Sequence, residues 1–370
     1  MVCGARDPSG YNRSGAFGTA TIGHLRPNSR LTSSRTYKAG YRDQATIPYC
    51  GAKQMICGVD VSSKSLDARI GRDGATASFT NNPKGIAELA EFCQCHKVHL
   101  VAMEATGGYE KKPFALLWAA GIQVAVVNPR AVRNFAHGMG LLEKTDRIDA
   151  GVIAWYAQTK GCVAISPASA EQQQLKAMVT RLRQLTELRA AQRNQRLLVT
   201  DKMVLKSFRK LLDLVQKQIR DLEVAIAGLI DADAVWHKLD ESFRSIKGVA
   251  DRTVARLMAE MPEIGTLSNK RISKLAGLAP LACDSGQWKG KRSVRGGRRT
   301  IREILFVVAA GVSRYNADFG AFRERLAAAG KAKKVIRIAL AHKLLVRLNA
   351  KARDVLQQLR EAPPAAVLLS

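Results

Sequence analysis

The chain has 370 residues, of which 46% are hydrophobic, so it is long enough for two or three globular domains with a substantial core. No apolar run approaches about 18 residues, which excludes a membrane-spanning helix. Lys and Arg outnumber Asp and Glu by 59 to 31, and the net charge of +28 indicates a polyanionic partner, most often nucleic acid. Basic scaffold proteins such as ribosomal proteins share this charge, so composition alone leaves the activity open.

Residues 1–54 differ in composition from the rest of the chain. They are rich in Gly, Ser, Arg and Thr, show no sustained periodicity, and lack the apolar centre of a signal peptide. We expect a disordered basic extension, which is either a nucleic-acid-binding arm or a translated upstream region. The seven cysteines include no CxxC pair, and "CQCH" lacks zinc-ligand spacing, so reduced thiols in the cytoplasm are expected.

Residues 55–165 alternate between strand and helix patterns, which predicts an α/β domain. A three-strand meander and two buried strands are expected at residues 55–62, 66–70, 75–80, 98–104 and 122–129. Helices are expected at residues 83–95, 109–121, 129–139 and 146–158. This order predicts a mixed sheet flanked by helices. In a ribonuclease-H-like sheet the first and fourth strands are neighbours.

Residues 166–241 carry a helical repeat. Apolar positions step by 3 and 4 along two segments: Leu175, Met178, Leu182 and Leu185 in the first, and Phe208, Leu212, Val215, Ile219, Leu222, Ile226 and Leu229 in the second. This seven-residue repeat indicates either the two arms of an antiparallel hairpin or coiled-coil dimerisation helices. Core helices of an ordinary bundle are the alternative, chiefly for the first arm.

A smaller, mainly helical domain is predicted over residues 242–355, followed by a flexible tail at 356–370. Its start, "IKGVADRTVARLMAEM", resembles a helix-hairpin-helix, whose turn amides grip a DNA phosphate, although Ala250 replaces the second glycine of such hairpins. Half of residues 289–302 are Lys or Arg and none is acidic. A basic helix is expected at residues 331–353.

Four acidic residues stand at the ends of these elements. Asp60 ends the first strand, and Glu104 ends a nearly all-apolar strand just before a Gly-Gly turn. Asp146 and Asp149, at i and i+3, share one face at the start of a helix. Three of these positions also have a purely structural explanation. An Asp at the end of a strand, such as Asp60, commonly caps a turn, and acids such as Asp146 and Asp149 are favoured in the first turn of a helix. Glu104 is harder to explain in this way, since desolvating an unpaired carboxylate is costly.

These carboxylates predict a metal site. If the first and fourth strands are neighbours, Asp60 and Glu104 meet at one edge of the sheet, and a helix crossing that edge adds the other two acids. A pair of divalent ions about 3.5–4 Å apart would supply the counter-charge and clamp the attacking and leaving oxygens of a phosphodiester. Mg²⁺, with Mn²⁺ as the alternative, suits oxygen ligands. Lys144 and Arg147 would then contact phosphates.

Five short motifs follow one another along the chain in this order: "GVDVSSK", "MEATGGYE", "NPRAVRNFAHGMG", "KTDRIDA" and "GLAPLACDSGQWKGKR". Together they resemble the DEDD transposases of bacterial insertion sequences, in the one-ten insertion-sequence family, which also contains Piv-type DNA invertases. The resemblance covers about residues 55–350 and implies a RuvC-like (RNase H-like) domain at 55–165, a coiled-coil linker at 166–241 and a transposase domain at 242–355. It also implies a bacterial, nucleoid-associated enzyme.

Carried over residue by residue, the resemblance assigns metal binding and catalysis to Asp60, Glu104, Asp146 and Asp149, and makes Ser285 the nucleophile. A serine hydroxyl needs activation by a metal or a neighbouring base. From local sequence alone Ser285 is equally a turn serine, Ser293 is a rival nucleophile, and Asp284 either orients Ser285 or caps the turn. The surrounding cations are expected to contact nucleic acid: Lys289, Lys291, Arg292, Arg295, Arg298 and Arg299.

The resemblance therefore implies a site-specific recombinase that cuts and rejoins donor and target DNA. The family also implies guidance by a structured noncoding bridge RNA. Because a long predicted hairpin separates Asp149 from Ser285, we hypothesise a dimer or tetramer in which the acids of one subunit meet the serine of another. A Holliday-junction nuclease using water and only the acids is the main alternative. A Piv-like DNA invertase and a non-catalytic nucleic-acid scaffold are the others.

Overall fold

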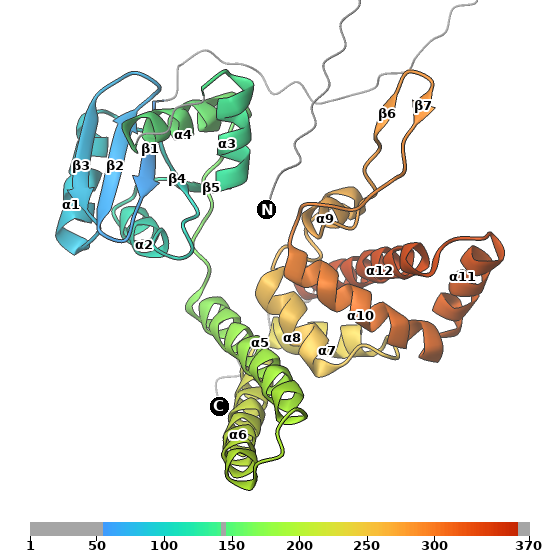
Figure 1. Cartoon of the computed structure of the whole chain (residues 1–370). Coiled ribbons are helices and arrows are strands. Elements are labelled where there is room, and N and C mark those ends of the chain that lie inside the picture. Colours follow the sequence, from blue (N-terminus) through green and yellow to red (C-terminus); the bar gives the residue numbers. More distant parts are fainter. Residues whose placement is uncertain (1–54, 142–145, 362–370) are drawn as a thin grey trace, which may run out of the picture. The chain divides into compact units, whose positions relative to one another are not determined.

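The structure, a computed structural model, describes residues 55–141 and 146–361. The expectations for residues 1–54 lie outside this part of the chain. Within the described residues no helix combines the length and the hydropathy that crossing a bilayer requires. The elements from β1 to α4 and those from α5 to α12 are described separately below (Figure 1).

A five-stranded mixed sheet organises the first part of the chain (Figure 1). Its strands are β1 (Ile56–Val61), β2 (Ser65–Ile70), β3 (Thr76–Thr80), β4 (Leu100–Glu104) and β5 (Val124–Val127). The spatial order is β3-β2-β1-β4-β5, with antiparallel pairing among β1, β2 and β3 and parallel pairing of β1 with β4 and of β4 with β5. The predicted adjacency of the first and fourth strands is confirmed.

Helices cover both faces of this sheet. They are α1 (Pro83–Cys95), α2 (Lys111–Ala119), α3 (Pro129–Gly138) and α4 (Asp146–Lys160). One apolar cluster joins α1 and α2 to the strand residues Cys57, Val59 and Val101. A second joins α3 and α4 to the alternate residues Ile56 and Ala102. Because side chains alternate along a strand, every second residue of β1 and β4 therefore faces α3 and α4.

Helix α4 lies directly on β1, and Gly58 makes this close approach possible. A Cβ atom at Gly58 would overlap the Ala150 carbonyl and lie 2.6 Å from the Ala154 nitrogen. Any larger residue would push the helix away from the strand. The glycine in "CGVDV" thus sets how near the start of α4 comes to the carboxyl end of β1.

The remainder of the chain is almost entirely helical. Its helices are α5 (Ala170–Arg196), α6 (Lys202–Ala232), α7 (Ala234–Arg244), α8 (Asp251–Glu260), α9 (Asn269–Leu275), α10 (Arg299–Tyr315), α11 (Ala317–Ala328) and α12 (Lys333–Glu361). A two-stranded hairpin, β6 (Asp284–Ser285) with β7 (Trp288–Lys289), lies between α9 and α10 in the sequence. The mixed sheet followed by a helical region matches the predicted fold class.

Helices α5 and α6 pack against each other and are joined by a short connection. The predicted positions Leu182 and Leu185 on α5 and Val215 and Ile219 on α6 are buried. Predicted positions nearer the start of α6, such as Phe208, are only partly buried. The supercoiled packing that defines a coiled coil stays a prediction.

The base of the α5–α6 pair and the smaller helical domain share one core. The same apolar cluster runs from Leu175 through Phe243 and Leu257 to Leu344. In addition, the Gln172 side-chain amide donates to the Met258 carbonyl over 3.0 Å, which ties the start of α5 to α8. The boundary expected near residue 241 therefore divides the sequence but not the hydrophobic core.

Helix α12 is the central helix of this region. Ile336, Leu344, Leu348 and Ala352 are buried along one side of it. The fully buried Asn349 accepts from the Gly265 backbone N–H over 2.9 Å and donates to the Leu267 carbonyl over 3.0 Å. The expected basic helix is thus also a core element, and it continues to Glu361, past the expected domain end at residue 355.

Candidate functional site

The carboxyl ends of β1 and β4 bring two of the predicted acids together. The parallel register pairs Ile56 with Leu100 and Val59 with Met103. Asp60 and Glu104 are the next residue on each strand, and both belong to the alternating set that faces α3 and α4. Each is half-buried at the edge where its strand ends.

A cavity of about 150 Å³ opens at this edge, and Asp60, Glu104 and Asp149 all line it. Asp149 lies in the first turn of α4, where unpaired backbone N–H groups favour a carboxylate. Its position there follows from the close contact of α4 with β1 at Gly58. Three acids separated by up to 89 residues in sequence therefore share one cavity, as the metal-site prediction requires.

The fourth predicted acid, Asp146, is the first residue of α4, but its side chain and that of Arg147 lie outside the described part, as does all of Lys144. Among the described side chains, no three His, Cys, Asp or Glu residues form a group that could hold a metal ion by itself. The three acids that line the cavity offer only oxygen ligands, the donor type that hard divalent cations prefer. Their chemistry therefore fits such an ion, and Asp146 would supply a further ligand.

Two basic side chains line the same cavity. Arg133 and His137 lie one helical turn apart on α3 and both line the cavity with the acids. The helix is started by Pro129 and by Asn128, whose Oδ1 accepts from the Arg130 N–H over 2.9 Å. These two residues were not among the predicted site residues, although both lie within "NPRAVRNFAHGMG" at positions i and i+4.

Glu110 fixes the turn that follows β4. Its carboxylate accepts from the Gly108 N–H over 2.8 Å, the Thr106 N–H over 3.1 Å and the Thr106 hydroxyl over 3.3 Å. Partial burial alone would raise the pKa of Glu110, but the backbone hydrogen bonds outweigh burial and lower it. The second acid of "MEATGGYE" thus orders the backbone beside Glu104.

Ser285 lies at the turn of the β6–β7 hairpin. It pairs with Trp288 across a two-residue turn in which Gly286 has a φ of +55°. Positive φ at the first turn position requires glycine in such hairpins, so Gly286 is needed for the turn. The Ser285 side chain is exposed, and Trp288 beside it is 61% exposed.

Asp284 does not cap this turn but forms an ion pair with Arg292, at 2.8 Å between Oδ2 and Nη1. The rival Ser293 lies where the two strands leave the hairpin, and its carbonyl accepts from the Leu281 N–H over 2.8 Å. The hairpin is therefore closed at both ends by backbone pairing. Ser285 stands near its tip and Ser293 near its base.

The predicted cations of this region divide into two groups. Arg298 donates to both carboxylate oxygens of Glu263, at 2.5 and 2.6 Å, and to the Glu260 carbonyl. Arg299 pairs with Glu303 over 2.6 Å on the surface. Three further cations are exposed and form no ion pair within the described part of the chain: Lys289, Lys291 and Arg295. Arg298 thus has a bridging role inside the domain, whereas these three face solvent.

The helix-hairpin-helix-like segment consists of α7, a turn and α8. Gly248 in the turn has a φ of +99°, and a Cβ atom there would lie 3.0 Å from the backbone of Val312 on α10. This glycine therefore serves close packing between helices. It is not explained by an approach to DNA.

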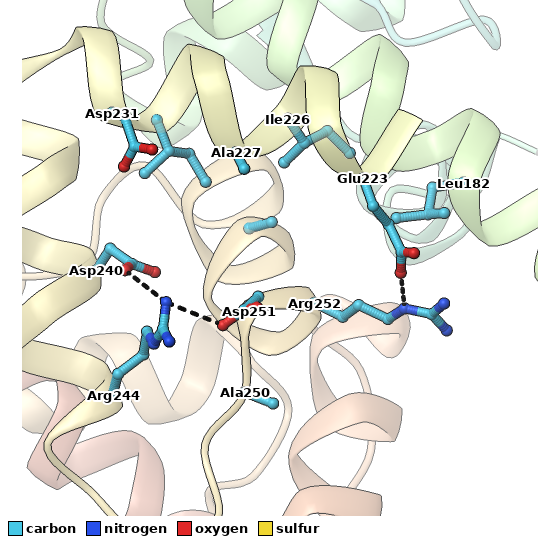
Figure 2. Close-up of a pocket in the computed structure, with 12 residues that line it drawn as sticks. Leu182, Glu223, Ile226, Ala227, Asp231, Asp240, Arg244, Ala250, Asp251 and Arg252 are labelled. Atoms are coloured by element: carbon cyan, nitrogen blue, oxygen red, sulfur yellow. Dashed lines mark hydrogen bonds and ion pairs between the residues drawn. The ribbon is translucent and has the colours of Figure 1, made fainter. Parts of the chain in front are cut away.

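A cavity of about 370 Å³ lies beside the start of α8, and acids surround it (Figure 2). Arg244 pairs with Asp240 at 3.4 Å and with Asp251 at 3.2 Å, and Arg252 pairs with Glu223. Burial raises the pKa of Asp240, although Arg244 acts in the opposite direction. These carboxylates oppose the phosphate contact that the sequence predicted at this helix N-terminus.

Two family models match the chain. Residues 57–202 match a model described as a transposase and named for a DEDD motif and IS110, and residues 240–324 match one described as the transposase IS116/IS110/IS902 family. Pilin gene-inverting proteins of Moraxella lacunata and Moraxella bovis are each 30% identical over 307 residues, covering 78% of this chain and 92% of theirs. The chain belongs to the IS110 family of transposases.

The transposase is accordingly a DNA recombinase enzyme, and the family resemblance stated from its five motifs is confirmed. Among solved structures, Thermus thermophilus RuvC aligns with 30% of the transposase and with 99% of its own chain, at 16% identity and a TM-score of 0.23. The first family model contains Asp60, Glu104 and Asp149, and the second contains Ser285. The matched regions thus include both predicted halves of the site.

Proposed function

We propose that the transposase cuts and rejoins donor and target DNA, with Ser285 as the nucleophile and with Asp60, Glu104, Asp146 and Asp149 holding divalent metal. The observation that carries this proposal is the shared cavity of Asp60, Glu104 and Asp149 at the carboxyl edge of β1 and β4. Mg²⁺ is the proposed ion and Mn²⁺ its substitute. When bound, it would stabilise the negative charge that develops on the phosphate oxygens.

Cutting and rejoining the DNA strand through Ser285 needs no cofactor other than the metal ion. The Ser285 oxygen attacks phosphorus and loses its proton, a P–O ester bond of the DNA strand breaks, and the leaving oxygen takes up a proton. The product is a phosphoserine-linked strand. A hydroxyl of the partner strand then attacks this phosphoserine, which restores the serine and forms the new phosphodiester.

The exposed hairpin supports Ser285 over Ser293 as the nucleophile. Both serines are exposed, but Ser285 lies beside the turn at the tip, and three solvent-facing cations follow it in sequence: Lys289, Lys291 and Arg295. These cations are proposed to position the phosphate backbone. Arg292 and Asp284 hold the shape of the hairpin, because their ion pair joins its two sides.

A covalent adduct tests this chemistry. The transposase is incubated with Mg²⁺ and DNA carrying the ends of its element, and the denatured mixture is probed for protein bound to labelled DNA. We expect an adduct in wild type and in Ser293→Ala, and none in Ser285→Ala. A Ser285→Ala protein that still cuts DNA would instead establish a nuclease that uses water.

We also propose that the active site is shared between subunits of a dimer or tetramer, and that a structured noncoding RNA guides both DNA partners. The net charge of +28 supports binding to several nucleic-acid strands at once. Mixed oligomers of Asp60→Ala and Ser285→Ala chains test the sharing, since recovered activity requires residues from two subunits. RNA that copurifies with the transposase and pairs with the element's junctions tests the guidance.

DNA inversion is the second candidate function, because the pilin gene-inverting proteins are 30% identical over most of their length. Inversion and transposition use the same strand chemistry and differ in the arrangement of the sites. A plasmid with two sites in inverted orientation distinguishes them. Flipping of the intervening DNA supports an invertase, whereas insertion into a separate target supports a transposase.

A further inference from the structure

The α3 face of the carboxylate cavity carries two basic side chains that the proposed chemistry has not yet used. Arg133 and His137 are exposed, are spaced by one helical turn, and line the cavity together with Asp60, Glu104 and Asp149. Their arrangement is fixed by the helix, since residues at i and i+4 lie on one face. The carboxylates come from the sheet and from α4, and the two basic side chains come from α3.

Arg133 does not neutralise these acids through direct ion pairs. Within the described residues its guanidinium forms no ion pair or hydrogen bond, and the same holds for the His137 ring. An arginine beside three carboxylates that pairs with none of them leaves its donors available for another anion. Arginine presents its donors as a planar fork that fits two oxygens of one phosphate.

A phosphate is the anion that this wall fits. The carboxylates alone would repel it, and a divalent ion held by them would attract it from one side. Donors from α3 would attract it from the other side. Because the cavity measures only about 150 Å³, its ligand beside the ion would be a single backbone phosphate of a strand that passes over it.

We propose that Arg133, assisted by His137, binds the DNA phosphate that enters the carboxylate cavity, so that these are positioning residues for the strand. This inference rests on the proposed metal site, because the phosphate and the ion would occupy the same cavity. It predicts that the metal and the DNA strengthen each other's binding through Arg133. The rival explanation is that Arg133 only adds positive potential near the acids.

The experiment measures this mutual effect directly. The affinity for a fluorescein-labelled four-way DNA junction is measured by anisotropy with Ca²⁺ and again with EDTA, using full-length protein. The ratio of the two affinities is the coupling factor, which is the same whether metal or DNA binds first. Ca²⁺ accepts the same oxygen ligands as Mg²⁺ and serves here as the binding probe.

Three variants are compared with wild type. Arg133→Gln removes the proposed phosphate contact, and His137→Gln removes the second side chain proposed to bind that phosphate. Arg130→Gln is the control, because Arg130 is an exposed cation of the same helix that does not line the cavity. Because all three side chains are exposed, the melting temperatures should agree with wild type. Arg133→Lys, which keeps the charge but not the fork, should restore the coupling only partly.

We expect Arg133→Gln to lower the coupling factor roughly tenfold, His137→Gln to lower it less, and Arg130→Gln to leave it unchanged. A loss of DNA affinity in Arg133→Gln that is equal with Ca²⁺ and with EDTA would overturn the inference and support the rival explanation. A coupling factor that Arg133→Gln leaves unchanged would also overturn it, with the metal site intact. If the wild-type protein binds DNA with the same affinity in Ca²⁺ and in EDTA, the metal site itself is refuted and the inference falls with it.

Discussion

Asp60 and Glu104 continue one parallel register, each following directly after the paired residues Val59 and Met103. The backbone ladder between β1 and β4 therefore fixes the relative positions of the two carboxylates before any ligand is present. Such preorganisation is what a metal-dependent phosphodiester site needs, because the ligands lose little freedom when the ion binds. Asp149 depends instead on the seating of α4 on the sheet.

Metal binding should stabilise the folded protein through these acids. Ligand that binds only the native state adds about 2.7 kcal/mol at a concentration of 100 times its Kd. We expect Mg²⁺ to raise the melting temperature of wild type and to have a much smaller effect on Asp149→Asn. Asp73→Asn is the matched control, because Asp73 lies on an exposed turn away from the cavity. An equal Mg²⁺ effect in all three proteins would contradict the site.

Gly58→Ala should strongly destabilise the α/β domain. The added methyl group would overlap the backbone of α4 at Ala150, and such overpacking costs roughly 1–3 kcal/mol or more. The Mg²⁺ effect should fall with it, since α4 carries Asp149. Gly228→Ala, at an exposed position about one turn before the end of α6 with open space around it, should instead stabilise by up to about 1 kcal/mol. Urea unfolding of the two variants measures both values.

Glu110 should contribute stability that depends on pH. Its pKa is lower in the folded state, so its contribution is present above the unfolded pKa of about 4.3 and is lost as pH falls through the folded value. We expect Glu110→Gln to be less stable than wild type at neutral pH, by under about 1 kcal/mol because solvent screens the group. The two unfolding curves should converge below about pH 4. A difference that persists in acid would contradict this account.

Arg298 and Arg299 are neighbours that should behave differently on substitution. Arg298→Gln leaves the half-buried Glu263 without its two hydrogen bonds and should cost about 2–3 kcal/mol of stability. Arg299→Gln removes an ion pair whose arginine is 81% exposed, and should leave stability almost unchanged because solvent screens the pair. Denaturant unfolding of both variants tests this. Equal effects would show that Arg298 does not hold the domain together.

Lys291→Gln should weaken DNA binding without changing stability. Lys291 is exposed and forms no ion pair among the described residues, so its charge is available to a phosphate. Losing one phosphate contact should reduce the slope of log K against log salt by about 0.9. Binding titrations at several salt concentrations, with a melting curve as the control, measure this. An unchanged slope would place Lys291 outside the DNA contact.

The strand order and the shared acidic edge were predictable because they depend on strong, local patterns. Buried runs such as that ending at Glu104 identify central strands, and an acid at the end of such a run has few ordinary explanations. Arg133 and His137 were not predicted as site residues. Two basic residues one turn apart on a short helix give the same sequence pattern whether they face solvent or line a cavity. Only the packing of α3 beside the sheet distinguishes the two cases.

The phosphate contact expected at the start of α8 stays a prediction, and the packing around it could not be read from local sequence. The turn at Gly248 has the sequence of a phosphate-binding hairpin, but a distant segment, Val312 on α10, determines why the glycine is needed. The carboxylates that surround the start of α8 also come from elements separated in sequence, among them Glu223 and Asp240. Local sequence reports the conformation of a turn, whereas its neighbours decide what the turn can bind.

The common core of the α5–α6 pair and the Ser285 domain has a mechanical consequence. Ile165 still donates a backbone hydrogen bond to β5, and Gln172 is already hydrogen-bonded to α8, so residues 166–169 form a four-residue connection between the α/β domain and the helical region. Because α5 shares its core with the helical region, the long helices and the serine hairpin would move together if the backbone of this connection changed direction. So short a connection limits how far the serine hairpin of one chain can lie from the carboxylate cavity of the same chain.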